Sequence, residues 1–289
     1  MDYSARNSNT TMEISIIVPF LNEEKYIKRC VKSLQRQTLK RRTKSELLFI
    51  DNGSTDSSTE IVRSLAPVKL LTETKPNVYA ARNKALSVAK GEIIAFTDAD
   101  CSVSVEWIST IQECFSDQAV GIVIGKRAFP KTHDPFLKYL EDYDNAKMKY
   151  VVTNGDVNTL FGFTNNMAVR KSAITKVRGF KELEVNGDTD LVQNIVKKTK
   201  YTVIYNEKML ITHLEITNCY QWYKKMYLYG FHNKTLSRQT SYKALTMADN
   251  ISIFKRASHK YTFREKSIAL LALAIGILSY KAGEIKAFT

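Results

Sequence analysis

Short apolar runs alternate with amphipathic stretches over the first 125 residues. Aliphatic, mostly β-branched residues fill these runs, and we expect buried strands over residues 14–18, 46–50, 68–71, 93–97 and 120–124. Between them, apolar residues recur at three- and four-residue spacing, which predicts helices that begin near Asn22, lie around 61–65, cover 77–89 and lie around 107–115. This alternation predicts an α/β protein with a mostly parallel central sheet covered by helices.

Turn and cap residues indicate where the loops of this sheet lie. Asn22 and Ser54 can cap the first two helices, because short polar side chains accept hydrogen bonds from the free N–H groups of a first turn. Gly53 permits a tight turn after the second strand. The polar loops that begin at residues 19, 51 and 98 all follow strand carboxyl ends, which is where open α/β sheets bind ligands. We therefore expect these loops to form one site.

Two acids, Asp98 and Asp100, end the apolar strand 93–97. In an extended backbone, residues two apart project to the same side, so the two carboxylates are expected to lie together. Adjacent carboxylates repel each other, and oxygen-rich sites suit Mg²⁺ or Mn²⁺. Taken alone, the pair is equally compatible with an acidic turn whose side chains are solvated.

Composition is that of a soluble globular protein, with 44% hydrophobic and 25% charged residues. A chain of 289 residues can hold one large domain or two small ones. The four cysteines show no zinc-binding spacing, and the N-terminus carries no apolar signal segment. We expect reduced thiols and a cytoplasmic protein.

Four motifs follow one another along the chain: residues 17–24 (IVPFLNEE), 51–56 (DNGSTD), 81–83 (ARN) and 98–100 (DAD). Together they resemble the family 2 inverting glycosyltransferases of the GT-A fold, a Rossmann-like α/β architecture, over roughly residues 14–215. The resemblance implies a UDP- or GDP-linked sugar donor and bound Mn²⁺ or Mg²⁺. It also implies donor-binding roles for Pro19, Leu21, Glu23, Asp51, Asn52, Arg82 and Asp98, and metal binding by Asp98 and Asp100. In the family, the Arg contacts the base and the first two loops hold base and ribose.

Two residues depart from the family pattern. Asn52 stands where a second acid is usual, which leaves the identity of the base open. Asn77 stands where Gly is common, a mild change because Asn tolerates positive φ.

The middle of the chain is less regular. Residues 126–158 are polar with interspersed aromatic residues and correspond to an acceptor-side insertion, and 161–170 resembles the family's strand beneath the acceptor. Residues 187–192 (GDTDLV) are similar to the family's E-D-x-D-L segment, with Gly187 in the Glu position and Asp188 matching the catalytic base. Without this resemblance, the segment reads as a helix N-terminus carrying acids. His213 matches a His that reaches the metal or diphosphate in some relatives, although a lone His is more often a surface or core residue.

On this interpretation the chain divides into four parts. These are a flexible N-terminus (1–12), a nucleotide-sugar-binding half (13–125), an acceptor-binding and catalytic half (126–219) and a basic C-terminal helical region (220–289). The formal net charge is +14, and residues 200–289 carry fourteen Lys and Arg against five acids. Such a region can face nucleic acid, an anionic membrane, a phosphorylated substrate, or solvent alone.

Residues 267–280 form a run of fourteen residues without a charge. As a helix it would be about 21 Å long, short of the roughly 30 Å hydrocarbon core of a bilayer. Because Lys and Arg flank it, we expect a peripheral or monotopic helix at an anionic membrane surface, on the cytoplasmic face. The alternative is a buried helix packed on the catalytic domain.

The leading hypothesis is therefore a metal-dependent, inverting transfer of a sugar from a nucleotide-diphospho-sugar to a glycan or lipid-linked acceptor, with Asp188 as base. A polyprenyl-phosphate glycosyltransferase of the dolichyl-phosphate-sugar synthase type is an alternative form of it. A nucleotidyltransferase is disfavoured, since residues 19–24 contain no Gly for a phosphate loop. A non-catalytic basic module leaves the acids at three strand ends unexplained, so we expect no nucleic-acid partner.

Overall fold

The computed structural model describes residues 12–37, 43–65, 67–154, 156–236 and 243–287. The segment expected to be a flexible N-terminus lies outside these residues except for Met12, which begins the first strand.

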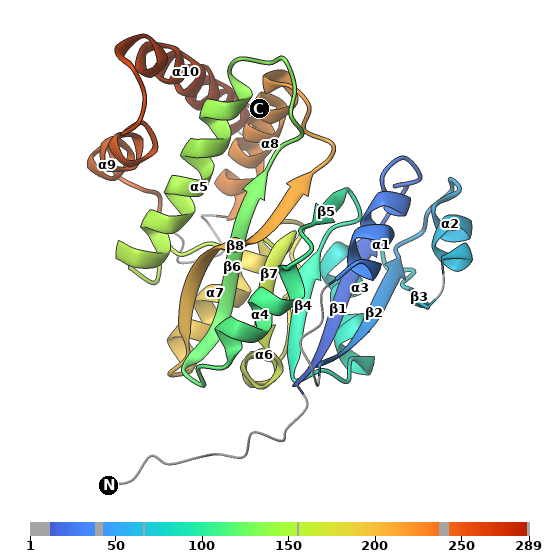
Figure 1. Cartoon of the computed structure of the whole chain (residues 1–289). Helices are drawn as coiled ribbons and strands as arrows, with labels where there is room; N and C mark the ends of the chain where they lie inside the picture. Colours follow the sequence, from blue (N-terminus) through green and yellow to red (C-terminus); the bar gives the residue numbers. More distant parts are fainter. Residues whose placement is uncertain (1–11, 38–42, 66, 155, 237–242, 288–289) are drawn as a thin grey trace, which may run out of the picture.

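In these ranges eight strands form one sheet in the order β3-β2-β1-β4-β7-β6-β8-β5 (Figure 1). β1 to β4 are parallel to one another, whereas β7 is antiparallel to β4 and β6, and β5 is antiparallel to β8. β6 and β8 pair in parallel, so most strands run the same way. The predicted mostly parallel α/β fold is confirmed. The strands are β1 (Met12–Phe20), β2 (Thr43–Asp51), β3 (Lys69–Thr72), β4 (Ile93–Thr97), β5 (Cys101–Val103), β6 (Val120–Ala128), β7 (Asn166–Arg170) and β8 (Thr202–His213).

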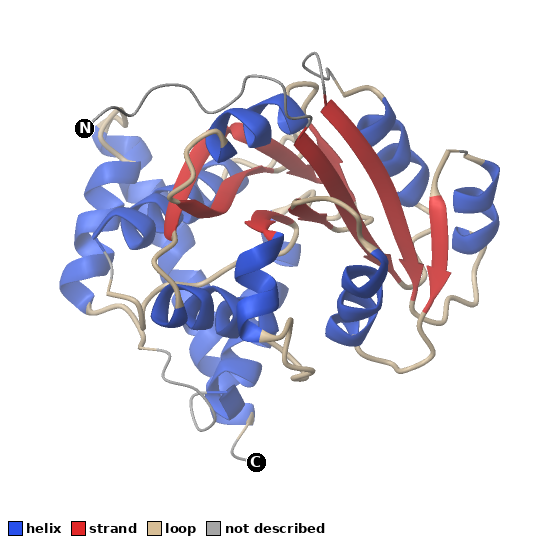
Figure 2. Ribbon diagram, turned by 90° about the horizontal axis from the view of Figure 1, so that it is seen from below, coloured by secondary structure: helices blue, strands red, loops and turns tan. Residues whose placement is uncertain are grey.

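Helices cover both faces of the sheet (Figure 2). One face packs against the apolar sides of α1 and α4, with Leu34, Trp107 and Phe115 buried there, and the other packs against α3, α6 and α7, with Ala85, Ile174 and Leu191 buried. The two faces bury separate hydrophobic clusters, as expected of a doubly covered sheet. The helices are α1 (Ile27–Gln35), α2 (Ser58–Ser64), α3 (Val78–Val88), α4 (Trp107–Phe115), α5 (Leu137–Asn154), α6 (Lys171–Val177), α7 (Gly187–Lys198), α8 (Cys219–Leu236), α9 (Met247–Ala257) and α10 (Phe263–Lys286).

Two cap predictions were wrong, because the side chains concerned bond across the molecule. α1 begins at Ile27, five residues after Asn22, and Asn22 lies at φ 56° and accepts from the N–H of Thr55 at 2.8 Å. The hydroxyl of Ser54 accepts from the N–H of Asn22 at 3.1 Å and caps no helix. Asn77 has φ −152°, so it needs no tolerance of positive φ; it is instead the N-cap of α3.

The second half of the chain is more regular than its sequence suggests. Most of the segment 126–158 is the eighteen-residue helix α5. β8 extends over twelve residues, and its parallel pairing with β6 contains two irregularities. β5, which was not predicted, pairs with the end of β8 through Cys101 and His213.

The C-terminal helices gather with α5 beyond the ends of β6 and β8 (Figure 1). α9 is tied to α5 by two tyrosines of α5, since Tyr143 donates to Asn250 at 2.7 Å and Tyr150 donates to Asp249 at 2.6 Å. α10 packs along α8 through small residues: a Cβ at Gly276 would lie 2.6 Å from the ring of Trp222, and one at Gly283 would lie 2.0 Å from the carbonyl oxygen of Tyr227. These approaches leave room only for hydrogen.

Candidate active site at the carboxyl ends of the strands

The Asp98–Asp100 segment leaves the strand and turns. β4 ends at Thr97, and the N–H of Cys101 donates to the carbonyl oxygen of Asp98 at 3.1 Å. The extended geometry expected for this segment was therefore wrong, because the chain must reverse to enter β5. The two side chains have different surroundings: Asp98 accepts from Nη2 of Arg82 at 2.9 Å, whereas Asp100 is buried.

Asp100 meets His213 across the β5–β8 pair. Oδ2 of Asp100 lies 3.4 Å from Nε2 of His213, and Oδ1 accepts from the thiol of Cys101 at 3.3 Å. Burial, with Lys225 and Arg127 nearby, holds the pKa of His213 well below its usual range, so the imidazole is neutral. Burial raises the pKa of Cys101, so its sulfur remains a protonated donor. The carboxylate and the imidazole are therefore the groups in this cluster in ligand form.

Further acids converge on this point. Burial, together with Asp100, Glu215 and Asp98, raises the pKa of Glu23 to about 8. The positive charge of Lys225 opposes this rise in pKa, and its Nζ lies 3.0 Å from Glu215 and 3.1 Å from Nε2 of His213. Glu23, Asp100 and Glu215 thus lie around Lys225, while Asp98 pairs with Arg82. The acids outnumber the cations here, which favours a bound cation.

This donor set fits a divalent cation such as Mn²⁺. It combines carboxylate oxygens with a neutral imidazole, and Nδ1 of His213 is buried without a partner among the described residues. Asp100 and His213 come together as predicted, while Asp98 is paired with Arg82. Metal binding by Asp98, Asp100 and His213 stays a prediction.

The two loops after β1 and β2 are joined by hydrogen bonds. The N–H of Glu23 donates to the hydroxyl of Ser58 at 2.7 Å, and that of Glu24 donates to Asp56 at 3.0 Å. Asp51 is buried and closes its own turn by accepting from the N–H of Ser54 at 2.8 Å. Of the other predicted donor residues in these loops, Pro19 is buried in β1, whereas the side chain of Leu21 is 52% exposed.

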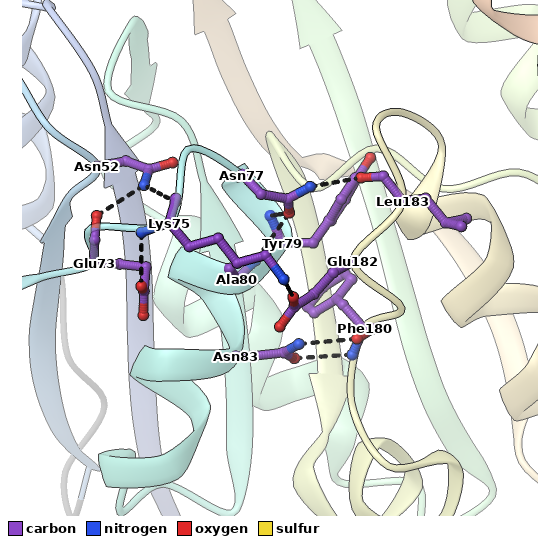
Figure 3. A network of polar contacts seen from close by, with 10 residues as sticks. All are labelled: Asn52, Glu73, Lys75, Asn77, Tyr79, Ala80, Asn83, Phe180, Glu182 and Leu183. Atoms are coloured by element: carbon purple, nitrogen blue, oxygen red, sulfur yellow. Dashed lines mark hydrogen bonds and ion pairs between the residues drawn. The ribbon is translucent and has the colours of Figure 1, made fainter.

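Asn52 belongs to a network that connects these loops with the segment before α7 (Figure 3). Its amide donates to the carbonyl oxygens of Glu73 and Lys75 at 2.9 and 2.7 Å, and Lys75 forms an ion pair with Glu182. Asn77 and Asn83 of the α3 region extend the network to the backbone of residues 180 and 183, with bonds of 2.9 to 3.0 Å. The segment that leads to Asp188 is thereby held against the donor side of the sheet.

Asp188 lies in the first turn of α7. The N–H of Thr189 donates to its Oδ1 at 2.9 Å, and the N–H of Thr164 approaches its Oδ2 at 3.4 Å. Burial raises the pKa of Asp188, while the positive charge of Arg82 opposes this shift. Arg82 is thus within electrostatic reach of both Asp188 and Asp98, and it lies over the rings of Tyr79 and Phe180.

Gly187 precedes Asp188 where the related motif carries Glu, and the structure explains the exchange. A Cβ at this position would lie 2.9 Å from three carbons of the Tyr79 ring. Tyr79 itself is buried and stacks on Phe180 with ring centroids 5.6 Å apart. The position therefore excludes any side chain as long as Tyr79 fills it.

Sequence reasoning missed the contribution of α8 to the site. The spacing of three and four residues between Trp222, Lys225 and Tyr229 places them on one face of a helix. This spacing is the sequence pattern that could have indicated that α8 contributes to the site. Trp222 donates from Nε1 to Asp144 at 3.0 Å, and Lys225 contacts His213. Tyr229 lies where the charges of Arg127, Lys225 and Asp188 all act on it.

A comparison with the sequence models of protein families identifies the family of this chain. The sequence model of glycosyl transferase family 2 matches residues 15–178, more than half of the chain. The chain belongs to glycosyl transferase family 2. The predicted family is confirmed, and the family is one of enzymes. The matched region includes Asp98, Asp100 and Arg82, whereas Asp188 and His213 lie beyond it.

Relatives of this family 2 chain are glycosyltransferases. The chain is 29% identical to the glycosyltransferase AglE of Haloferax volcanii over 187 residues, which are 62% of this chain and 60% of AglE. It is 33% identical over 156 residues to the poly(ribitol-phosphate) beta-glucosyltransferase of Bacillus spizizenii, covering 50% of this chain and 24% of that protein. The chain thus spans less than two thirds of the length of these relatives.

Solved structures share the fold of this family 2 chain. The mannosyltransferase PcManGT of Pyrobaculum calidifontis, solved in complex with GDP-Man and Mn²⁺, matches with a TM-score of 0.62 at 16% identity, over 95% of this chain and 86% of that one. Residues 1–349 of S. aureus TarS, solved with UDP-GlcNAc, match with a TM-score of 0.53 at 18% identity, over 96% and 89% of the chains. Both carry the GT-A architecture, which confirms the predicted fold class.

Proposed function

We propose that this protein transfers a sugar from a nucleoside-diphospho-sugar to a glycan or lipid-linked acceptor, with inversion at the sugar carbon and with a divalent metal. The observation that carries the proposal is the convergence of Glu23, Asp98, Asp100 and His213 at the carboxyl ends of the strands, with Asp188 across Arg82 from them. The family supports transfer of a sugar, and the nucleotide sugars in PcManGT and TarS support the donor class.

The donor would lie over the loops after β1 and β2. Asp51 and Asn52 lie where base and ribose are expected, and both are held by backbone hydrogen bonds that reduce the cost of ordering them on binding. Binding measurements with UDP- and GDP-linked sugars would determine whether the base is uracil or guanine.

Asp100 and His213, with Asp98, would hold Mn²⁺ or Mg²⁺ next to the diphosphate. A bound divalent cation neutralises the charge that develops on the departing diphosphate. Lys225, already beside His213 and Glu215, would add a second positive charge on that side of the site.

Asp188 would accept the proton of the attacking acceptor. Its Oδ1 accepts from the N–H of Thr189 at 2.9 Å, whereas its Oδ2 has only the long contact of 3.4 Å with the N–H of Thr164, so Oδ2 would accept the proton of the acceptor. A base at this position, across Arg82 from the acids, suits attack on the sugar from the side opposite the leaving diphosphate.

A donor panel tests the proposal. UDP- and GDP-sugars with Mn²⁺ are expected to stabilise the protein in a thermal-shift assay, and one of them to be hydrolysed slowly. Asp100→Ala should remove the Mn²⁺-dependent part of nucleotide binding and abolish turnover, because it withdraws a charged ligand. Glu106→Ala, on the loop before α4, is the matched control. Nucleotide binding by Asp100→Ala with unchanged metal dependence would contradict the metal assignment.

We also propose that α10 lies on an anionic membrane surface at the cytoplasmic face. It is the one helix among the described residues that is long and apolar enough to cross a membrane, and 22% of its apolar window is buried. α10 has twenty-four residues, ten more than the uncharged run 267–280 from which its length was predicted. The prediction that this helix is too short to span a bilayer was therefore wrong. Its attachment along α8 favours a helix that lies in the interface.

In α10 the small side chains face the protein and the large apolar side chains face outward, which is the opposite of the arrangement in a helix of a soluble protein. The small residues Ala269, Ala272, Gly276 and Gly283 face the protein and are buried. The larger Leu270, Leu271, Ile277 and Leu278 are more than half exposed and share one face by their spacing. Small residues at a helix contact and large apolar residues outside are typical of helices in lipid. Lys260, Arg264, Lys266 and Lys281 supply the charge that anionic headgroups attract.

A further inference from the structure

A partly buried cluster of cations and aromatic rings lies beside Asp188, on the side of α5 and α8. Arg127, at the carboxyl end of β6, places its guanidinium carbon 3.6 Å from the ring centroid of Phe163. Its backbone is fixed on both sides by Asn145, which accepts from the N–H of Arg127 at 3.0 Å and donates to its carbonyl oxygen at 2.7 Å. Arg127 is therefore held in place before any ligand binds.

The charges of this cluster do not balance. Nη2 of Arg127 lies 3.5 Å from Oδ2 of Asp144, and that same oxygen already accepts from Nε1 of Trp222 at 3.0 Å. Lys147, one turn further along α5, is close enough to Arg127 for the two positive charges to repel. Two cations thus share one carboxylate, and one positive charge is left over.

Lys147 has no hydrogen-bond or ion-pair partner among the described residues. Its Nζ lies 5.4 Å from the ring centroid of Phe161, a cation–π contact that replaces only part of the lost hydration. Burial is the largest influence on its pKa, which is lowered, and Asp144 opposes the shift. A partly buried ammonium in this state gains from any anion that enters.

Tyr229 of α8 completes the cluster and connects it to the reaction centre. Its hydroxyl has no partner in the described part of the chain, and the charges of Arg127 and Asp188 both act on it. The cluster borders Asp188 through its aromatic rings as well, since a Cβ at Gly162, between Phe161 and Phe163, would lie 3.1 Å from the carbonyl oxygen of Asp188.

We propose that Arg127, Lys147 and Tyr229 bind a phosphoryl group carried by the acceptor. The proposal rests on the function proposed above. A planar guanidinium, an ammonium and a phenol from three separate elements present donors from several directions, which suits a tetrahedral group with three free oxygens. Phe161 and Phe163 exclude water around the cations and strengthen the attraction.

The test uses inorganic phosphate as the probe and calorimetry on the full chain. Wild-type protein should bind phosphate, and Lys147→Met and Tyr229→Phe should each weaken this binding, the former roughly tenfold or more, since a charge-assisted bond is lost. Lys149→Met is the matched control: Lys149 lies on the same helix, is 60% exposed and pairs with Glu207 at 2.8 Å, so phosphate binding should not change. Arg127→Gln is a third variant, used if its melting temperature remains that of the wild type.

Donor binding separates this inference from the proposed function. Lys147→Met should bind the nucleotide sugar with Mn²⁺ as tightly as wild type does. Wild-type protein that binds donor and shows no phosphate binding, or binding that Lys147→Met leaves unchanged, would overturn this inference alone. Wild-type protein that binds no nucleotide sugar overturns the proposed function, whatever phosphate does.

Two sources of the phosphoryl group are distinguished by a second arm. Water-soluble polyol phosphates and a polyprenyl phosphate in vesicles of neutral lipid are offered separately to wild type and Lys147→Met. Lys147-dependent binding of the first assigns a phosphorylated polyol acceptor, and of the second a lipid phosphate. Binding of both without dependence on Lys147 overturns the site.

Discussion

Nη2 of Arg82 donates to Oδ1 of Asp98 at 2.9 Å, and the same guanidinium is the main charge that lowers the pKa of Asp188 against the effect of burial. Arg82 is itself 3% exposed and lies over the ring of Tyr79. One buried cation therefore influences the acid predicted to bind the diphosphate and metal and the acid predicted to accept the proton.

Replacing Arg82 should move the pH dependence of turnover. Asp188 must be ionised to accept a proton, so kcat falls as the pH drops through its pKa. Arg82 lowers that pKa, so Arg82→Gln should shift the acidic limb to higher pH, by about one unit or more. Arg82→Lys keeps the charge and should shift the limb less. A pH–kcat profile measures both, and an unchanged limb in Arg82→Gln would separate Arg82 from the base.

Asp188→Asn should lower kcat by roughly 10²-fold or more and leave donor affinity nearly unchanged, because the shape is kept and the base is lost. Single-turnover kinetics and donor titration check the two parts. Asp190→Asn is the matched control, since Asp190 lies two residues further along α7 and pairs with Lys181 at 2.8 Å. Weaker donor binding in Asp188→Asn would instead place this residue in the nucleotide pocket. If the attacking group is a phosphate that is already ionised, kcat should change little.

Gly187→Ala should destabilise the protein by about 1 to 3 kcal/mol, since its Cβ would overlap the Tyr79 ring. Urea unfolding measures the loss. In a Tyr79→Leu background the same substitution should cost clearly less, because the ring that it meets is gone. An equal cost in both backgrounds would show that the tightness at Gly187 has another origin.

Substitutions on the outer face of α10 should release the protein from membranes. Leu271→Gln together with Leu278→Gln should reduce cosedimentation with anionic vesicles severalfold or more, because each buried leucine contributes about 1.5 to 3 kcal/mol. The melting temperature should not fall, since both side chains are exposed. Ser267→Gln, also exposed on α10, is the control.

Removing α10 would not test membrane contact as clearly as these substitutions do. Ending the chain before α10 would uncover Trp222, which packs against Gly276 and is 4% exposed. Truncated protein would then lose stability whether or not α10 meets lipid. If the point variants sediment with anionic vesicles as wild type does, the exposed face of α10 serves another contact.

Local sequence determined the strands and the family. Residues 93–97 are apolar enough to be a buried strand in any parallel sheet, and all five are buried. The motifs after β1, β2 and β4 could be placed at one edge because parallel strands end together. Period and spacing are local properties, so they can be read from neighbouring residues alone.

Only the tertiary structure decided where the polar side chains bond. Asn22 and Ser54 have the composition of helix caps, yet each bonds to the other's loop, because two loops brought together offer free N–H groups that a sequence pattern does not reveal. The partnership of Lys225 with His213 likewise depends on α8 returning to the sheet. Arg127, Lys147 and Tyr229 come from three elements up to about a hundred residues apart, so their unbalanced charge exists only in the folded chain.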